Sequence, residues 1–447
     1  MSRPRSRPPA STAEFEADIT SLGHDGRGVA RIDGKAVFVT GALAGEHVRL
    51  RIRQRHRHYD EADTVEVLVA SPDRVVPKCP HFGVCGGCTL QHLSPAAQIA
   101  GKQQVLAENF ARIGKVEPRE WLPPLTDALW NYRRHGRLSV RAVPKKGRVL
   151  VGFREAANPR YVADLRHCDV VHPQLGERIE KLGDLLGTLE GAANIPQIEF
   201  AAGDDTVALV FRHMQPLSEH DRQALIAFAQ AEGFAIYLQP GGITSVAPLW
   251  PASPRLSYTL SPGGGAADVE LEFQPLDFVQ VNGGMNRKML AHAMQLLDPQ
   301  PGDRVLDLFC GLGNFTLPLA RRVAEVAGVE GEHGLVERAA ANAQHNGIAN
   351  AQFHVANLFE DQRGAEWART PWDKLLLDPP RAGADQVLAH LPHKATRRVV
   401  YVSCHPASLA RDAGILVHQH GYTLRAAGVM DMFPHTAHVE SIALFER

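Results

Sequence analysis

Residues 307–315 read DLFCGLGNF and close a short apolar run that begins near position 304. A carboxylate followed by Gly311-x-Gly313 at a strand end is typical of a turn that lets a ligand approach the backbone. Four more strand patterns follow at 325–330, 351–355, 373–378 and 398–403, with helical stretches between them. This alternation predicts a mostly parallel α/β sheet, covered by helices on both faces, from about residue 276 onward.

Three reactive side chains lie beside the ends of these strands. Residues 400–406 read VYVSCHP and place Cys404 just after the last parallel strand, while residues 376–381 read LLDPPR and place Asp378 after the strand before it. Residues 438–440 read HVE and place Glu440 ahead of the final strand. A thiol and a base at the same sheet edge suit covalent activation of a flat, electrophilic ring.

The glycine turn by itself is compatible with two classes of cofactor. A dinucleotide site usually has a third glycine three residues after the second, where this chain has Thr316. Glu330 ends the second strand, where a carboxylate can bind both hydroxyls of a ribose. S-adenosylmethionine has no pyrophosphate and does not need the longer glycine loop, so the pattern favours it over a nicotinamide cofactor.

The size and composition of the chain indicate a globular protein of two or three domains. It has 447 residues, of which 44% are hydrophobic and 22% are charged. There is no apolar run of about 18 residues that would span a membrane. The first residues carry Arg3, Arg5 and Arg7 without an apolar core, so they predict a disordered basic arm over 1–13 and not a secretory signal. We therefore expect a cytoplasmic protein with no membrane partner.

Charge is unevenly distributed along the chain. The net charge is −1, but residues 1–160 hold 26 Lys and Arg against 16 Asp and Glu, and residues 161–447 hold 22 against 33. A basic front half predicts a polyanionic partner. The alternative is that these charges only form solvated faces.

Two segments of the front half are candidate RNA surfaces. Residues 14–71 show short strands separated by glycine turns, typical of a small β-barrel. Five arginines in this segment alternate along one strand and would share a face, which suits single-stranded nucleic acid; they are Arg49, Arg51, Arg53, Arg55 and Arg57. The alternative is an edge strand protected by charge. Residues 131–141 add four arginines with Tyr132 and His135 between them.

Three cysteines lie close together in the sequence, in CPHFGVCGGC over residues 79–88. Cys79, Cys85 and Cys88 can turn onto one centre, and Cys168 could supply a fourth thiolate. In a cytosolic chain such a set predicts a metal site, and the spacing leaves both zinc and an iron–sulfur cluster open. Cys310, at the glycine turn, is expected to be a small packed thiol.

The chain resembles the 5-methyluridine RNA methyltransferases over residues 14–447. The resemblance is carried by SCHP at 403–406, DPPR at 378–381, HVE at 438–440 and the four cysteines. GRGVAR at 26–31 and GKAVFV at 34–39 resemble the TRAM module of RNA-modifying enzymes. In having both the TRAM module and the four cysteines, the chain resembles the RumA/RlmD branch of this family, which methylates 23S ribosomal RNA.

The resemblance implies roles for particular residues. Cys404 would attack carbon 6 of a uracil, and Glu440 would remove the carbon 5 proton after methylation. S-adenosylmethionine would contact six residues: Gln280, Phe309, Asn314, Glu330, Asn357 and Asp378. A 4Fe–4S cluster would be held by Cys79, Cys85, Cys88 and Cys168. The substrate would be the uridine at conventional position 1939 of 23S rRNA, and no protein partner is implied.

The same resemblance predicts how the domains divide. An OB-like TRAM barrel would occupy 14–71, and a central α+β iron–sulfur domain would occupy 72–92 and 125–275. A Rossmann-like catalytic domain of the class I methyltransferase type would occupy 93–124 and 276–447.

Several other functions share parts of this pattern. They are methylation of tRNA, methylation of two sites in 23S rRNA, and RNA binding through the cluster without catalysis. A DNA cytosine-C5 methyltransferase is disfavoured because its nucleophile follows a proline, whereas Cys404 follows Ser403.

Overall fold

The computed structural model describes residues 13–391 and 394–447. These residues form two compact units, one made by residues up to Lys102 with His435–His438, the other by Gln103–Pro434 with Val439–Arg447. The predicted basic arm lies almost entirely outside the described residues. In the described parts of both units no helix is long and apolar enough to cross a membrane.

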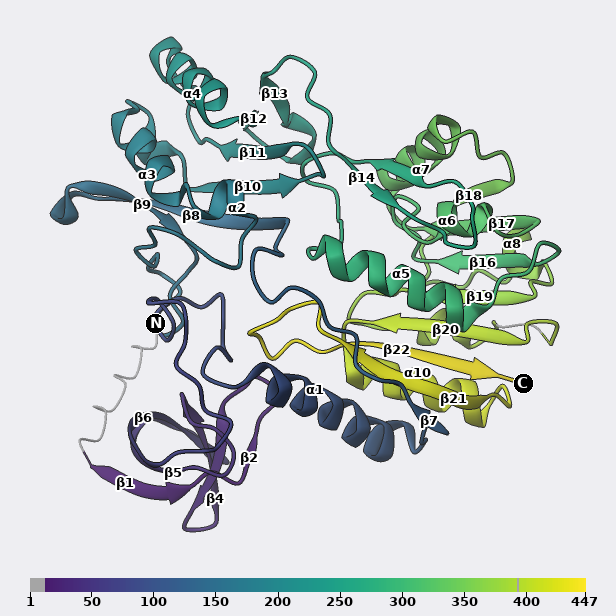
Figure 1. Cartoon of the computed structure of the whole chain (residues 1–447), viewed down its shortest axis with the longest axis horizontal. Coiled ribbons are helices and arrows are strands. Elements are labelled where there is room, and N and C mark those ends of the chain that lie inside the picture. The colour runs from purple at the N-terminus through teal and green to yellow at the C-terminus, as the bar shows by residue number, and fades with distance from the viewer. Residues whose placement is uncertain (1–12, 392–393) are drawn as a thin grey trace, which may run out of the picture. The chain divides into compact units, whose positions relative to one another are not determined.

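An eight-stranded sheet dominates the larger unit, in the order β18-β17-β16-β19-β20-β22-β21-β7 (Figure 1). Its first five strands are parallel and confirm the five strands predicted from the sequence. β22 runs antiparallel to β20 and to β21, and β7 lies parallel to β21 at the edge. The strands are β16 (Arg304–Leu308), β17 (Glu325–Glu330), β18 (Ala351–Val355), β19 (Lys374–Leu377), β20 (Arg398–Ser403), β21 (Thr423–Met430), β22 (Glu440–Glu446) and β7 (Glu120–Trp121).

Helices cover both faces of this sheet because side chains along each strand alternate between faces. On β20, Val400 and Val402 belong to the core cluster that includes Met289 of α5 (Gly283–Leu297). Between them, Tyr401 donates a 2.6 Å hydrogen bond to Asp412 of α10 (Pro406–His418). The shorter helices of this region are α6 (Thr316–Ala320), α7 (His333–His345), α8 (Glu366–Arg369) and α9 (Asp385–Leu388).

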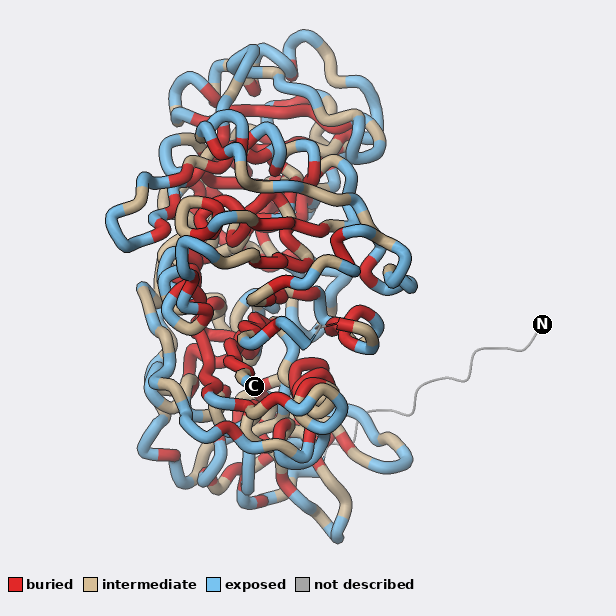
Figure 2. The backbone as a smooth tube through the Cα atoms, turned by 90° about the vertical axis from the view of Figure 1, so that its right-hand side faces the viewer, coloured by how far each residue is buried: buried red, intermediate tan, exposed pale blue. Residues whose placement is uncertain are grey.

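A second, six-stranded sheet in the larger unit has the order β13-β12-β11-β10-β8-β9. Its strands are β8 (His135–Val143), β9 (Arg148–Gly152), β10 (Gln197–Ala202), β11 (Val207–Arg212), β12 (Phe234–Gln239) and β13 (Ala247–Trp250). Its helices are α2 (Pro173–Gly176), α3 (Ile179–Thr188) and α4 (Glu219–Glu232). The inner strands β11 and β12 are almost entirely buried, whereas the outer strand β13 is mostly exposed. Figure 2 colours the buried residues red and the exposed residues pale blue along the chain.

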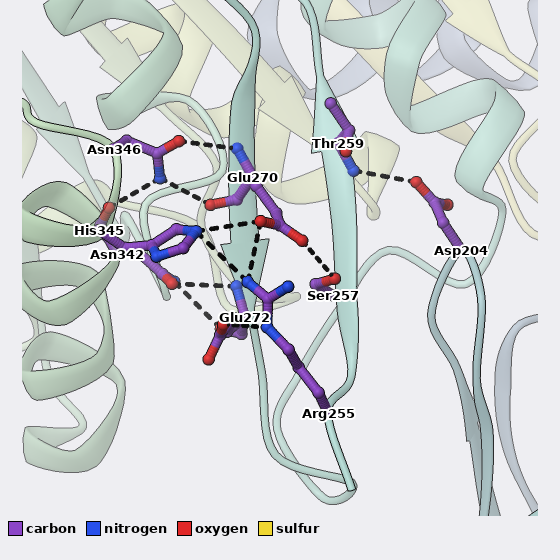
Figure 3. Close-up of polar contacts among 9 residues, drawn as sticks. All are labelled: Asp204, Arg255, Ser257, Thr259, Glu270, Glu272, Asn342, His345 and Asn346. Atoms are coloured by element: carbon purple, nitrogen blue, oxygen red, sulfur yellow. Dashed lines mark hydrogen bonds and ion pairs between the residues drawn. The ribbon is translucent and has the colours of Figure 1, made fainter.

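A β-hairpin, β14 (Ser257–Leu260) and β15 (Val269–Glu272), follows this sheet in the chain. Its tip holds Gly263, Gly264 and Gly265 in left-handed conformations, which glycine adopts without the strain that a side chain would cause. Two asparagines of α7 pair with the free edge of β15 as a neighbouring strand would (Figure 3). Asn342 binds the backbone N–H and C=O of Glu272, and Asn346 binds those of Glu270, all at 2.7–3.0 Å. The hairpin is thereby fixed to the helix that follows β17.

The smaller unit is a six-stranded sheet in the order β1-β5-β6-β4-β3-β2. Its strands are β1 (Glu14–Asp18), β2 (Ser21–Leu22), β3 (Gly28–Ile32), β4 (Lys35–Thr40), β5 (His47–Arg55) and β6 (Tyr59–Val69). Helix α1 (Pro95–Asn109) follows in the chain and continues into a short π-helix over Phe110–Gly114.

The arginine strand differs from the prediction. β5 lies between β1 and β6, so it is not an edge strand, and Arg57 falls beyond its end. Carboxylates of the neighbouring strands pair with three of the arginines. Arg49 bonds Glu16 and Glu66, Arg51 bonds Glu14, and Arg53 bonds Glu61 and Asp63. Cross-strand pairing therefore neutralises most of this face without RNA.

The second candidate RNA surface, residues 131–141, is also largely used within the fold. Tyr132 is buried and donates to the carbonyl of Pro434 at 3.1 Å. Arg134 pairs with Asp204 at 2.6 Å, and Arg137 pairs with Glu199 at 3.0 Å. Tyr132 therefore does not form part of an exposed RNA surface, and contact of the arginines with RNA stays a prediction.

Candidate active site

A cavity of about 440 Å³ opens at the carboxyl ends of the parallel strands of the eight-stranded sheet. In this arrangement, ligands bind beyond the strand ends. All eight residues predicted to be catalytic or to bind the cofactor line it, namely Cys404, Glu440, Gln280, Phe309, Asn314, Glu330, Asn357 and Asp378. Residues separated by up to 160 positions in the sequence thus meet around one space.

The glycine turn after β16 forms one wall of the cavity. Phe309, Gly311 and Gly313 all have positive φ, at 64°, 55° and 95°. A β-carbon at Gly311 would meet no atom within 4 Å, so the turn faces open space there. The backbone N–H of Gly311 donates to the carboxylate of Glu330 at 3.1 Å, which fixes this acid at the cavity edge.

A fully buried carboxyl, Asp307, lies beneath the turn. Burial raises its pKa to about 8, and the Thr316 hydroxyl, which donates to it at 2.5 Å, offsets only part of that effect. The negative charges of Asp378 and Glu330 raise this pKa further. Asp307 is therefore a hydrogen-bonding support for the turn that is largely protonated near neutral pH.

Asn314 is held by two residues that the sequence analysis did not identify. It exchanges two amide hydrogen bonds with Asn286 of α5, at 2.9 and 3.0 Å. The Tyr258 hydroxyl on β14 donates a third, at 3.0 Å. The hairpin and α5 thus set the orientation of this amide, and one N–H of its side chain is left for a ligand.

Asn357 builds a tight turn after β18. Its side-chain oxygen accepts from the N–H of Phe359 at 3.1 Å, and its amide donates to Glu360 at 2.8 Å. The turn presents Phe359, whose ring lies 5.9 Å from that of Phe309 at the cavity wall. These two rings offer an aromatic surface for a flat ligand.

Asp378 follows β19 and is partly buried at the cavity floor. Burial raises its pKa to about 7. The side-chain amide of Gln280 donates to it at 3.4 Å. A carboxylate here would balance a cationic ligand.

Cys404 lies between the end of β20 and the start of α10. The next residue, His405, caps the helix by accepting the N–H of Ser408 at 3.4 Å. Burial raises the pKa of the Cys404 thiol to about 11, the charges of Glu440 and Asp378 add to this, and Arg381 opposes it. In the ligand-free protein the sulfur is therefore a protonated thiol.

Helix α10 also holds the loop that carries Arg381. The Ser408 hydroxyl donates to the backbone carbonyl of Arg381 at 2.7 Å. Asp412, fully buried, accepts the backbone N–H of Ala384 at 2.7 Å. One helix thus places both Cys404 and Arg381 at the cavity.

Glu440 is the first residue of β22 and lies opposite Met430 of β21. Only 8% of its surface is exposed, and its side chain lines the cavity together with Cys404. Two antiparallel strands therefore fix its backbone, which suits a base that must meet one particular proton.

The predicted metal ligands lie outside this cavity. Cys79, Cys85 and Cys88 are partly exposed in the smaller unit, in a loop held by short backbone bonds such as Cys85 N–H to His81 at 2.9 Å. Cys168, in the larger unit, is also partly exposed, and its N–H donates to Gly176 at 3.0 Å. Cys310 is 4% exposed, which confirms it as a packed thiol.

Sequence profiles of two families match the chain. The tRNA (Uracil-5-)-methyltransferase family matches residues 267–447, and the TRAM domain matches residues 12–65.

Full-length relatives share most of the sequence. The 23S rRNA (uracil(1939)-C(5))-methyltransferase RlmD of Xanthomonas euvesicatoria pv. vesicatoria is 61% identical over the whole of both chains. The RlmD protein of Xylella fastidiosa is 60% identical over 97% of both. Among solved structures, Pyrococcus abyssi tRNA (uracil-54, C5)-methyltransferase with S-adenosyl-L-homocysteine has a TM-score of 0.72 at 23% identity. That alignment covers 96% of this chain and all of the other, and it shows a shared fold.

Proposed function

The chain belongs to the RlmD family of 23S rRNA (uracil-C5)-methyltransferases, and we propose that Cys404 and Glu440 carry out its reaction through a covalent bond to uracil. The protein is an S-adenosylmethionine-dependent methyltransferase that methylates carbon 5 of a uracil in 23S rRNA. We assign the relatives' target, uridine 1939, to this chain as well.

The cavity supports a specific placement of the methyl donor. Glu330 would bind the ribose hydroxyls, and Phe309 with Phe359 would contact the adenine. Asn314 and Gln280 would hold the amino acid end, and Asp378 would lie near the positive sulfonium. S-adenosylmethionine supplies an electrophilic methyl group when bound. The residues around it fix its position.

Carbon 5 of uracil needs activation before it can take that methyl group. The Cys404 sulfur would attack carbon 6 and form a carbon–sulfur bond, which moves an electron pair to carbon 5 and the carbonyl. Carbon 5 would then take the methyl group, and Glu440 would accept the proton from carbon 5. The carbon–sulfur bond would break as the ring double bond returns, releasing the thiolate.

The observation that carries this proposal is the shared position of Cys404 and Glu440 at one cavity, where the charge of Glu440 adds to the effect of burial on the pKa of Cys404. Burial, together with the negative charges of Glu440 and Asp378, raises this pKa and keeps the resting thiol protonated. A bound sulfonium cation would oppose those charges and lower the pKa of Cys404. The nucleophile would thus become reactive mainly when the methyl donor is in place.

The target base must leave its stack to reach Cys404, because the cavity lies beyond the strand ends. RNA-binding surfaces outside the cavity are therefore required. The TRAM segment is one of them. We infer that its sheet closes as an OB-like barrel, because β1 and β2 lie at opposite ends of the sheet and only Ile19 and Thr20 join them.

We also propose the 4Fe–4S cluster that the family resemblance implies. The donor set fits it, because Cys79, Cys85, Cys88 and Cys168 offer four partly exposed thiols outside the catalytic cavity. No step of the reaction depends on the cluster. Protein purified without oxygen should contain about four irons and be brown. A colourless protein with one zinc would contradict this assignment.

The proposed reaction is tested by replacing the base. Glu440→Gln should allow sulfur attack and methylation but block removal of the proton, so a denaturant-resistant protein–RNA adduct should accumulate with S-adenosylmethionine present. Turnover should fall by roughly two to four orders of magnitude. Glu337→Gln, on the exposed face of α7, is the matched control and should turn over normally. The absence of any adduct in Glu440→Gln would assign the base to another group.

A further inference from the structure

The outer edge of the six-stranded sheet in the larger unit carries a concentration of positive charge. Residues 141–166 hold seven Lys and Arg against two Asp and Glu, in a chain whose net charge is −1. They form the end of β8, the strand β9 and the loop after it. By contrast, residues 13–102 hold 11 of each sign. Half of the basic excess of residues 1–160 therefore lies in residues 141–160, and none of it lies in residues 13–102.

The two faces of this edge are covered by different segments. Helix α3 packs on one face, where a β-carbon at Gly183 would lie 3.0 Å from the Val149 carbonyl. On the other face the loop after β9 folds back, so that a β-carbon at Gly152 would lie 2.7 Å from the Ala163 carbonyl. Arg141 of β8 points to the same side as Gly152, since Ser139 pairs with Gly152 and residues two apart share a face.

The loop presents an aromatic ring on a rigid turn. The backbone N–H of Tyr161 donates to Asn158 at 2.9 Å, and that of Glu155 donates to Tyr161 at 3.1 Å. The Arg154 guanidinium donates to the Pro159 carbonyl at 3.3 Å. The Tyr161 side chain is nevertheless 56% exposed. An ordered loop with an outward tyrosine is a stacking platform without a partner in this unit.

Four cations of residues 141–166 lack carboxylate partners. Within the described residues, no acidic group lies at ion-pair distance from Arg141, Lys145, Arg154 or Arg160, and all four are exposed. Their neighbours Lys146 and Arg148 pair with Asp164 instead. On β5, by contrast, carboxylates of the neighbouring strands form ion pairs with Arg49, Arg51 and Arg53.

We propose that Arg141, Arg154, Arg160 and Tyr161 form a second RNA-anchoring surface, on which an unpaired base stacks against Tyr161 while the arginines contact adjacent phosphates. This proposal rests on the proposed function, because the charge and the exposed ring fit a single-stranded RNA segment of the same substrate. The surface binds RNA outside the cavity, so it acts on affinity and leaves the chemical step unchanged.

The test uses the full-length protein and a transcript of the 23S rRNA segment around uridine 1939. Tyr161→Ala should weaken RNA binding and raise KM for RNA about tenfold with kcat unchanged, and Tyr161→Phe should restore both. The double variant Arg141→Ala/Arg160→Ala should lower the salt slope of log Kd by about one to two, as expected for two lost phosphate contacts. Arg222→Ala, an exposed arginine on α4, is the control and should match the wild type.

The outcomes separate this surface from the proposed function. If the wild type methylates the transcript and all variants bind it with wild-type affinity and salt slope, this surface binds something other than RNA and the proposal is overturned. If Tyr161→Ala lowers kcat at saturating RNA, the residue acts in the chemistry and the anchoring role is wrong. Failure of the wild type to methylate would count against the proposed function instead.

Discussion

The floor of the catalytic cavity and the β5 strand hold charged groups in opposite ways. At the cavity, burial raises the pKa values of Asp378 and Cys404, which line it, and of Asp307, which lies beneath the glycine turn. On β5, Arg49, Arg51 and Arg53 have carboxylates of adjacent strands within 3.4 Å. Charges that lack partners inside the fold indicate where a ligand supplies one, and fully paired charges indicate a structural role.

The largest effect is expected at the cavity. Cys404→Ser should abolish methyl transfer, because a serine hydroxyl is not ionised enough to attack carbon 6, while binding of S-adenosylhomocysteine and RNA should remain close to wild type. Single-turnover transfer of labelled methyl groups measures the first property, and equilibrium titration measures the second. If Cys404→Ser turned over near the wild-type rate, Cys404 would have no part in the mechanism. The charged groups of the cavity would then have no more functional role than those of β5.

An intermediate effect is expected on the reactivity of the same thiol. Because its pKa is about 11, alkylation of Cys404 by iodoacetamide should keep accelerating from pH 7 to pH 10 without a plateau. Glu440→Gln removes a negative charge that raises this pKa, so Cys404 in this variant should be alkylated several-fold faster than in the wild type at pH 8. Saturating S-adenosylmethionine should shift the wild-type profile in the same direction.

Peptide mass spectrometry can follow Cys404 separately from the other five cysteines. An alkylation profile that levels off near pH 8 in the ligand-free wild type would contradict the charge arrangement at the cavity. Equal rates for the wild type and Glu440→Gln would mean that Glu440 does not influence the thiol.

The smallest effect is expected on β5. Arg51→Ala removes an exposed pair with Glu14, so the free energy of unfolding should fall by no more than about 1 kcal/mol. RNA affinity should change by less than about twofold, since this arginine already has a partner. Urea unfolding and RNA titration measure the two quantities. A tenfold loss of RNA affinity would show that RNA displaces Glu14 and that paired arginines also bind substrate.

The strands of the catalytic sheet, and Cys404, Asp378, Glu440 and Glu330 at their ends, could be predicted from local patterns, whereas Gln280, Phe309, Asn314 and Asn357 were implied by the family resemblance. Buried parallel strands are continuous apolar runs, and their carboxyl ends meet at one edge. Cys404, Asp378 and Glu440 could therefore be placed near one another from strand order alone.

The neighbours that orient these residues could not be predicted in this way. Tyr258 and Asn286 reach Asn314 from a hairpin and a helix whose docking depends on tertiary packing. The partners of the β5 arginines come from two other strands, so their pairing depends on a register that the arginine pattern does not encode. Phe359 belongs to none of the motifs found in the sequence, although an aromatic residue two positions after Asn357 could have indicated a second ring at the cavity wall.

The central claim is a transient bond between one sulfur and carbon 6 of the target uracil. A transcript with 5-fluorouridine at position 1939 replaces the carbon 5 proton that Glu440 would remove by fluorine, which cannot leave as a proton. With S-adenosylmethionine, the wild type should form a permanent cross-link that mass spectrometry locates at Cys404 and that Cys404→Ser does not form. A wild-type enzyme that methylates the normal transcript yet never cross-links to the fluorinated one would contradict the covalent mechanism.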